Sequence, residues 1–329
     1  MRKILILDGQ NSDRWGLYFI ANLKMSSTTV EPHLRSPTAD KSAGPSESVG
    51  QVLLNLARIP SVRVAAAIMV GLILCYWPLM ATLPGLWFDK DSYYSHGLLV
   101  PLIAGYIIYS RREALKKIPV SGNNLALIPL AVLMYVAWVA SRTSQAAFLS
   151  VLFVASILLC VWFLAGGRWV AALSAPVLYL LFGLPIWAST IDAYTNPLQQ
   201  ISTRTSFAML RAVGMNPMQL DSTTIQLNQF SLDVGIPCSG LKLILAISAF
   251  IAFFIMIAKL RWWANALLVA LVIPICIFVN GFRIALIGIV GNQFGENAGH
   301  QFHDYSGYLS ILVCFVILGK ITKELGWNP

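Results

Sequence analysis

The stretch Pro237-Cys238-Ser239-Gly240-Leu241 stands where a polar segment gives way to an apolar run. A proline followed by small residues suits the first turn of a helix, so the stretch predicts a helix with one cysteine at its polar end. The remaining cysteines fall inside apolar runs, where a cysteine is usually a small core- or lipid-facing residue. They are Cys75, Cys160, Cys276 and Cys314. Cys238 therefore stands apart, and the rest of the chain is interpreted around it.

The composition indicates a membrane protein. Hydrophobic residues make up 57% of the chain and charged residues only 11%, with a mean hydropathy of +0.70. A soluble domain carries about a quarter charged residues. Apolar runs long enough to cross a bilayer recur from about residue 62 onward, which predicts an all-α polytopic fold. The net charge of +9 does not imply nucleic acid as a partner, because basic residues hold loops on the cytoplasmic side of a membrane.

Eight transmembrane helices are predicted from the apolar runs. They cover about residues 63–83, 97–110, 124–140, 146–165, 168–188, 240–258, 264–284 and 306–321. The second is short and is expected to tilt or to begin earlier. Alternating sides place 17 of the 23 lysines and arginines on one side, so the positive-inside rule predicts cytoplasmic termini in a cell (inner) membrane.

The chain divides into a tail and a membrane domain. Residues 1–60 are polar without sustained periodicity and are expected to form a flexible cytoplasmic tail, while 61–325 form the membrane domain. Three segments, 84–96, 189–237 and 285–305, are then predicted to face outward.

The longest outward segment has structure of its own. Residues 196–213 suit a short amphipathic helix on the membrane surface. Apolar residues then alternate on both sides of Asn228-Gln229, which predicts a β-hairpin leading to Cys238, with an irregular loop as the alternative.

Cys238 is a candidate nucleophile because a thiol at a helix N-terminus experiences the positive end of the helix dipole. That field lowers the thiol pKa and raises the thiolate fraction. Lys242 lies four residues further on, on the same helical face, and is expected to add to the effect. The alternative is a buried structural cysteine.

Arg283 is a candidate stabiliser of negative charge. It follows Asn280-Gly281-Phe282 and is flanked by apolar residues, where an arginine is expensive and needs a partner. Its fork of donors suits a carboxylate or a developing oxyanion, with Asn280 as a supporting residue. Snorkelling to the outer headgroups is the alternative.

Histidines complete the candidate site, since an imidazole beside a thiol is the expected general base. His300 and His303 both lie near the start of the last span, Asp304 is placed to orient an imidazole, and His96 is expected to shape the cleft from the same side. Zinc bound by both histidines with Cys238 or His96 is the alternative. It lacks an accompanying HExxH or CxxC motif, so no metal or cofactor is predicted.

Together these residues resemble the exosortase/archaeosortase family of membrane cysteine transpeptidase-like enzymes over roughly residues 60–325. The resemblance rests on four ordered motifs: Tyr94-Ser95-His96-Gly97-Leu98-Leu99-Val100-Pro101, Pro237-Cys238-Ser239-Gly240-Leu241-Lys242, Asn280-Gly281-Phe282-Arg283, and His303 four residues before Gly307-Tyr308. It implies that Cys238 is the nucleophile, that Arg283 is the family's arginine and that His303 is the third member. His300 matches no motif and ranks second.

The resemblance also implies a function. Such enzymes process exported proteins that carry a PEP-CTERM-like C-terminal sorting signal, made of a short motif, an apolar span and a basic cluster. Cleavage at the outer face through a thioester would pass the protein to an acceptor nucleophile that the sequence does not identify. Two alternatives stay open: a transporter, and a non-catalytic scaffold of an exopolysaccharide system. A transporter would distribute polar residues across the bilayer depth, whereas here they gather at one face.

Overall fold

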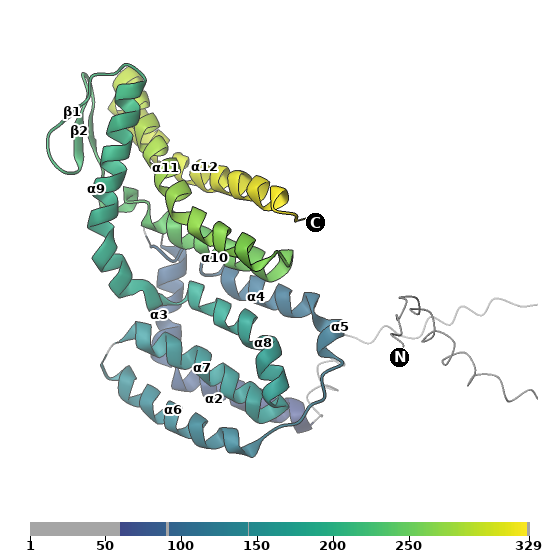
Figure 1. Cartoon of the computed structure of the whole chain (residues 1–329). Helices are drawn as coiled ribbons and strands as arrows, with labels where there is room; N and C mark the ends of the chain where they lie inside the picture. The colour runs from purple at the N-terminus through teal and green to yellow at the C-terminus, as the bar shows by residue number, and fades with distance from the viewer. Residues whose placement is uncertain (1–59, 90–91, 144, 328–329) are drawn as a thin grey trace, which may run out of the picture. The chain divides into compact units, whose positions relative to one another are not determined.

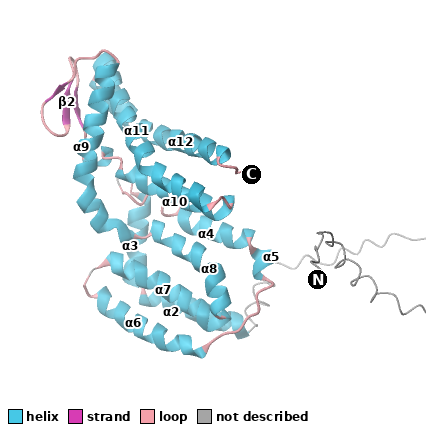
Figure 2. Cartoon of the chain, in the orientation of Figure 1, coloured by secondary structure: helices cyan, strands magenta, loops and turns pink. Residues whose placement is uncertain are grey.

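The computed structural model describes residues 60–89, 92–143 and 145–327, with side chains from residue 67 onward, and is mainly helical there (Figures 1 and 2). The helices are α2 (Pro60–Cys75), α3 (Trp77–Phe88), α4 (Leu99–Ser110), α5 (Arg112–Leu115), α6 (Leu127–Ser141), α7 (Ala146–Ala165), α8 (Gly167–Tyr179), α9 (Ala188–Ala212), α10 (Leu241–Ala258), α11 (Trp262–Phe294) and α12 (Glu296–Glu324). Short 3-10 turns are η1 (Asn124–Ala126), η2 (Leu180–Gly183), η3 (Pro185–Trp187) and η4 (Ile236–Cys238). Residues 1–59 of the predicted tail lie outside the described residues.

Five of the described helical segments are long and apolar enough to cross a membrane: Asn124–Ser141, α7, α10, α11 and α12. Two bent pairs raise the number to seven if each is one span, namely α2 with α3, bent by 76°, and Gly167–Gly183 with Pro185–Ala212, bent by 64°. Helix α4 has 12 residues, about 18 Å of helix, against a hydrocarbon core of about 30 Å. The predicted helical, multi-pass membrane protein is confirmed, whereas the number of eight spans stays a prediction.

The last two helices are longer than their apolar runs. Helix α11 has 33 residues, about 50 Å, and α12 has 29. They meet at Gly295, whose φ of 91° suits glycine and ends α11. Residues 285–305, predicted as an outward segment, are thus almost wholly helical. The sequence did not predict this, because a fall in hydropathy marks where a helix leaves the lipid and not where the helix ends.

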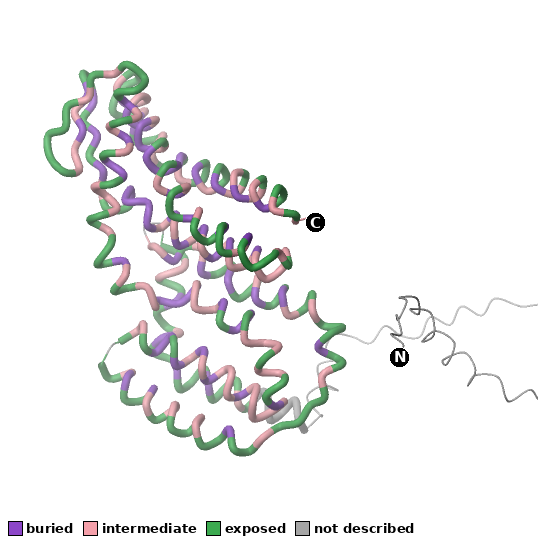
Figure 3. Tube along the Cα trace, in the orientation of Figure 1, coloured by how far each residue is buried: buried purple, intermediate pink, exposed green. Residues whose placement is uncertain are grey.

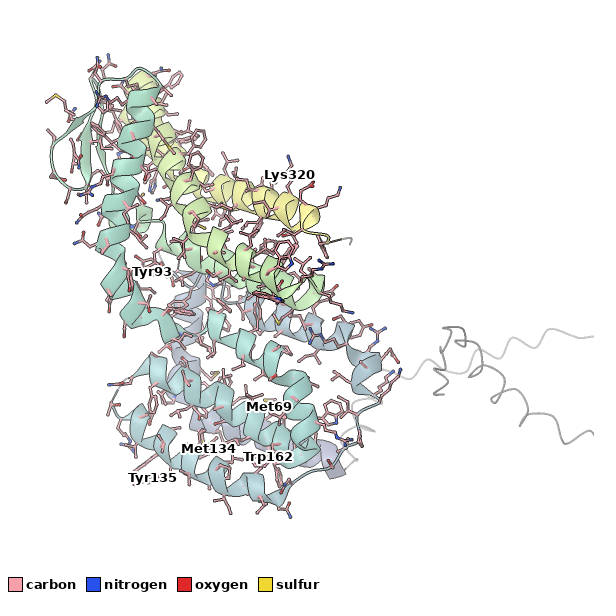
Figure 4. All side chains as sticks on the ribbon, viewed as in Figure 1. Met69, Tyr93, Met134, Tyr135, Trp162 and Lys320 are labelled. Atoms are coloured by element: carbon pink, nitrogen blue, oxygen red, sulfur yellow. The ribbon has the colours of Figure 1, made fainter. Side chains whose placement is uncertain are left out.

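The helix ends gather at two opposite ends of the bundle. Figure 1 shows α5, the α10–α11 junction and the end of α12 at one end, and α9, the sheet and the α11–α12 junction at the other. The Arg111 guanidinium donates to the Met256 carbonyl at 2.8 Å, which ties the end of α4 to the end of α10. Figure 4 places Lys320 at this end and Tyr93 at the opposite end. The α7–α8 junction lies at the same end as α5 and the α10–α11 junction (Figure 1), so the basic residues of these three connections share one end of the bundle. Which end faces the cytoplasm stays a prediction.

The predicted hairpin is present. Strands β2 (Thr224–Gln226) and β3 (Ser231–Asp233) pair antiparallel with Ile225 opposite Leu232, around the predicted turn. The structure adds a strand, β1 (Met218–Gln219), so that the sheet order is β1-β2-β3. The helix predicted over 196–213 is longer in the structure. Helix α9 begins at Ala188 and continues through Pro197.

Small residues bring the hairpin and α9 close to α11. A Cβ at Gly281 would lie 2.5 Å from the Thr205 methyl group of α9, and one at Gly291 would lie 2.7 Å from the Phe230 ring. Leu210 and Ile225 are fully buried in the core that these elements share. Figure 3 shows buried segments on α9 and α11. Helix α9 and the sheet are thereby fixed against the helix that carries Arg283.

Candidate functional site

Cys238 lies in a tight turn just before α10. Its N–H donates to the Gly235 carbonyl at 2.9 Å, and the Ser239 N–H donates to the Ile236 carbonyl at 3.1 Å. Gly240 then adopts φ 85°, and α10 begins at Leu241. The cysteine was predicted at the polar end of the helix, and it lies just before α10, because the left-handed glycine separates η4 from α10.

The thiol of Cys238 faces His303 of α12. Its Sγ lies 2.8 Å from Nε2 of the imidazole, while Nδ1 lies 3.4 Å from Oδ1 of Asp304. A tautomer with its proton on Nδ1 leaves the Nε2 lone pair free to accept the thiol proton. Asp304 is 79% exposed, so its contribution to holding that tautomer is small. Residues 65 positions apart thus form a thiol–imidazole pair.

Arg283 binds the same turn of α12. Its Nε donates to Oγ of Ser306 at 2.9 Å and its Nη2 donates to the His303 carbonyl at 3.1 Å. Ser306 is buried and also donates to that carbonyl, at 3.0 Å. The arginine therefore has the partners that a guanidinium among apolar residues needs. These two contacts use two of its five N–H donors and hold the turn that carries the imidazole.

Asn280 and Ser202 hold the cysteine turn from the other side. The amide of Asn280 donates to the Cys238 carbonyl at 2.8 Å and to Oγ of Ser202 at 2.9 Å. Ser202 of α9 in turn donates to the Ser239 carbonyl at 3.1 Å. A Cβ at Gly240 would lie only 3.0 Å from the Asn280 amide nitrogen, so the glycine is needed for the close approach. Both Asn280 and Ser202 are buried.

Ser202 was not among the predicted site residues. A signal was present, because Gln199, Ser202, Thr203 and Ser206 form a polar row at helical spacing. Such a row predicts a distinct face of α9 but does not say that the face packs inward on α11. It does so here, where Ser202, Thr203 and Ser206 are all buried.

The thiol pKa differs from the prediction. Burial raises the pKa of Cys238 above its usual value, the charge of Arg283 lowers it, and Asp233 raises it further. Desolvation is the largest of these causes because Cys238 is only 6% exposed. The charge of Arg283 acts on the thiol, and the charge of Lys242 lowers the pKa of the His96 imidazole.

His96 packs where α4 meets the α8–α9 junction. Its Nε2 donates to the Phe182 carbonyl at 3.2 Å, because a carbonyl can only accept. Its Nδ1 is buried and has no hydrogen-bond partner among the described residues. Burial is the main cause that lowers the pKa of this imidazole. A role for His96 in a substrate cleft stays a prediction.

His300 lies away from the thiol pair. It is exposed on α12, with Nε2 3.5 Å from Oε1 of Glu296 one turn earlier. The structure thus places His303, and not His300, beside Cys238. Within the described part of the chain no group of three or more His, Cys, Asp or Glu side chains is placed to hold a metal ion.

The fold and the site define a helical, multi-pass membrane protein with a cysteine–histidine pair at one end of its bundle. The chain belongs to the transmembrane exosortase family, whose sequence model matches residues 87–319. The predicted family is confirmed, and it is a cysteine transpeptidase-like group of membrane sorting enzymes that act on exported proteins. No curated protein and no solved structure matches the chain. The matched range contains Cys238, Arg283 and His303.

Proposed function

We propose that the chain is a membrane cysteine peptidase/transpeptidase that cleaves the C-terminal sorting signal of exported proteins. The observation that carries the proposal is the 2.8 Å approach of Cys238 Sγ to His303 Nε2 in a member of this family. A thiol within hydrogen-bond reach of an imidazole is the arrangement that nucleophilic catalysis by cysteine needs.

The reaction proceeds in two acyl transfers. Nε2 of His303 takes the thiol proton as Sγ attacks the scissile carbonyl carbon, and the carbonyl electrons move onto oxygen. When they return, the C–N bond breaks, the leaving amine takes the proton from His303, and a thioester to Cys238 remains. An acceptor N–H or O–H then attacks the thioester with His303 as base, and Sγ leaves and regains its proton.

Arg283 has three roles in this proposal. Its contacts to Ser306 and to the His303 carbonyl fix the imidazole, and its charge opposes the effect of burial on the thiol pKa. Its remaining donors are suited to the developing oxyanion. Asn280 and Ser202 act as positioning residues, because they bind the carbonyls of Cys238 and Ser239.

The site is proposed to lie at the outer face. Basic residues of the α4–α5, α7–α8 and α10–α11 junctions gather at the end of the bundle opposite to α9 and the sheet, and such residues favour the cytoplasm. A substrate whose sorting signal includes an apolar span would lie beside the helices with its scissile bond at this face. Its basic cluster would then stay on the cytoplasmic side.

The test is the mass of a processed substrate. An exported protein with a PEP-CTERM-like signal is co-expressed with the wild type, Cys238→Ala or Cys75→Ala, the last as a control on an exposed cysteine in a helix. We expect the wild type and Cys75→Ala to process it and Cys238→Ala to leave it intact. A bare new carboxylate indicates hydrolysis and an added mass indicates transfer. Processing by a folded Cys238→Ala variant would refute the proposal and favour a scaffold.

A further inference from the structure

A groove lies at the end of the bundle opposite to the thiol pair, where α4 ends, α5 follows and α8 begins. It encloses about 410 Å³. Its lining includes Gly105, Ile108 and Tyr109 of α4, Arg112 and Lys116 of α5, and Trp169 of α8. None of these residues belongs to the site described above.

The interior of the groove is apolar and open. Helix α4 contributes the Ile108 side chain and the bare backbone of Gly105. A Cβ built at Gly105 would meet no atom within 4 Å, so the groove is open beside this position of α4, and this part of the groove is called the slot below. An apolar slot at the surface of a membrane bundle suits an acyl chain, because burying its methylene groups is favourable and requires no polar partner.

Cations stand at the rim of the groove. The guanidinium of Arg112 lies 4.2 Å from the centre of the Tyr109 ring, and its Nη1 donates to the Tyr109 carbonyl at 3.2 Å. These contacts hold a charge at the mouth of the slot. Lys116 stands beside it, and both cations share one carboxylate, that of Glu113, at 2.9 Å from Lys116 and 3.6 Å from Arg112. The pair therefore keeps a net positive charge.

Trp169 contributes a polar group, its indole N–H, to the same lining. Its indole N–H is buried and has no hydrogen-bond partner among the described residues. A buried donor without a partner is costly, so an acceptor oxygen from a ligand would be favourable here. Tryptophan is also a common residue at the boundary between lipid tails and headgroups.

We propose that this groove binds one phospholipid of the surrounding bilayer whose headgroup carries a net negative charge. One acyl chain lies in the slot along Gly105, and the phosphate lies beside Arg112 and Lys116. Basic pockets between membrane helices bind anionic headgroups in this way. A bound lipid would join α4 to α8. At the ends of these helices away from the groove, α4 follows His96, and α8 leads into η2, whose Phe182 carbonyl accepts from His96.

The test uses the purified full-length chain, titrated with phosphatidylglycerol or with phosphatidylcholine of the same acyl chains and read by native mass spectrometry. We expect retention of one phosphatidylglycerol in preference to phosphatidylcholine. Replacing Arg112 and Lys116 by Gln should weaken phosphatidylglycerol binding about 25-fold, since each cation near a headgroup contributes about fivefold. The matched control replaces Lys320 and Lys323 by Gln, two exposed cations at the same end of the bundle.

A second variant tests the slot without changing the charge. Gly105→Leu fills it, while Gly319→Leu is the control, because a side chain at either helical glycine meets open space. Only Gly105→Leu is expected to lose the lipid. Equal weakening by the two charge-neutralised pairs would show diffuse attraction and overturn the site, as would lipid retention by Gly105→Leu. Competition by inorganic phosphate as strong as that by the lipid would also overturn it, since the acyl chain would then contribute nothing.

Discussion

Removing the hydroxyl of Ser202 tests whether α9 positions the nucleophile. This hydroxyl accepts from Asn280 at 2.9 Å and donates to the Ser239 carbonyl at 3.1 Å, and the residue is 1% exposed. Ser202→Ala removes both bonds and leaves an amide N–H and a carbonyl unpaired. A buried hydrogen bond contributes about 0.5–1.5 kcal/mol, so about 2 kcal/mol of restraint on the turn is lost.

The effect should appear at the thiol. Cys238 is 6% exposed, so an alkylating reagent reaches Sγ when the turn opens. If the lost hydrogen bonds lower the free energy of that local opening by about 2 kcal/mol, the alkylation rate rises by up to about 30-fold. Processing of a substrate should fall at the same time, because Sγ is held less firmly against His303. Faster alkylation with slower processing distinguishes a positioning residue from a general loss of activity.

Ser206→Ala is the matched control. Ser206 lies one turn further along α9 and is 0% exposed, but its hydroxyl donates to the Thr203 carbonyl within the same helix. The alkylation rate of this variant should stay within about twofold of the wild type, since the turn is untouched. Thermal unfolding of both variants checks that the bundle is intact. Equal alkylation rates for Ser202→Ala and the wild type, or for the two variants, would refute the reasoning.

Four further outcomes are expected. His303→Ala should slow thiol alkylation near neutral pH and recover part of the rate only as the pH rises above about 8.5, the ordinary cysteine value, toward the raised pKa of Cys238; identical pH profiles for this variant and the wild type would remove His303 as the base. Arg283→Lys should lose most processing although it keeps the charge, because one ammonium cannot replace the Nε and Nη2 contacts to α12; near wild-type processing would contradict this. Burial raises the pKa of Cys238, so its neutral thiol stabilises the fold below the ordinary value, and that stability is lost as the pH rises through the raised value; the free energy of unfolding of the wild type should therefore fall relative to Cys238→Ala in alkaline solution, and parallel curves would argue against it. A cysteine introduced at Thr223 should react with a membrane-impermeant maleimide in intact cells and one at Lys116 should not, and the reverse pattern would place the thiol pair on the cytoplasmic side.

The sequence predicted that the main candidates share one end of the bundle. Cys238, Arg283 and His303 each stand at the edge of an apolar run, and alternation of the predicted spans would place them on the same side. The contacts of His303 with Cys238 and Arg283 agree with this expectation. The order of the motifs also favoured His303 over His300, and the structure places His303 beside the thiol. Sidedness is a property of the alternation of spans, so it can be derived without knowing how the helices pack.

The role of Ser202 and the direction of the Cys238 pKa shift depend on how the helices pack, which the sequence alone does not give. Ser202 lies in a polar row that is equally consistent with solvent exposure, and it reaches the cysteine turn because Gly281 lets α9 approach α11 closely. The same limit explains the thiol pKa: a helix start predicts a lower value, but the depth of burial, which reverses the direction, depends on the neighbouring elements.

Burial and pairing have opposite effects on the thiol, and together they explain how a buried cysteine can be both stable and reactive in the proposed mechanism. Desolvation disfavours an isolated thiolate, so the resting thiol is neutral and protected from adventitious electrophiles. Transfer of the proton across 2.8 Å to His303 creates the thiolate only together with an imidazolium, so each charge has its counter-charge. Arg283 fixes the imidazole through α12, and Asn280 fixes the thiol through its own carbonyl. Because Asn280 and Arg283 lie three residues apart on α11, one helix sets the position of both partners, and a change in its packing should alter nucleophile and base together.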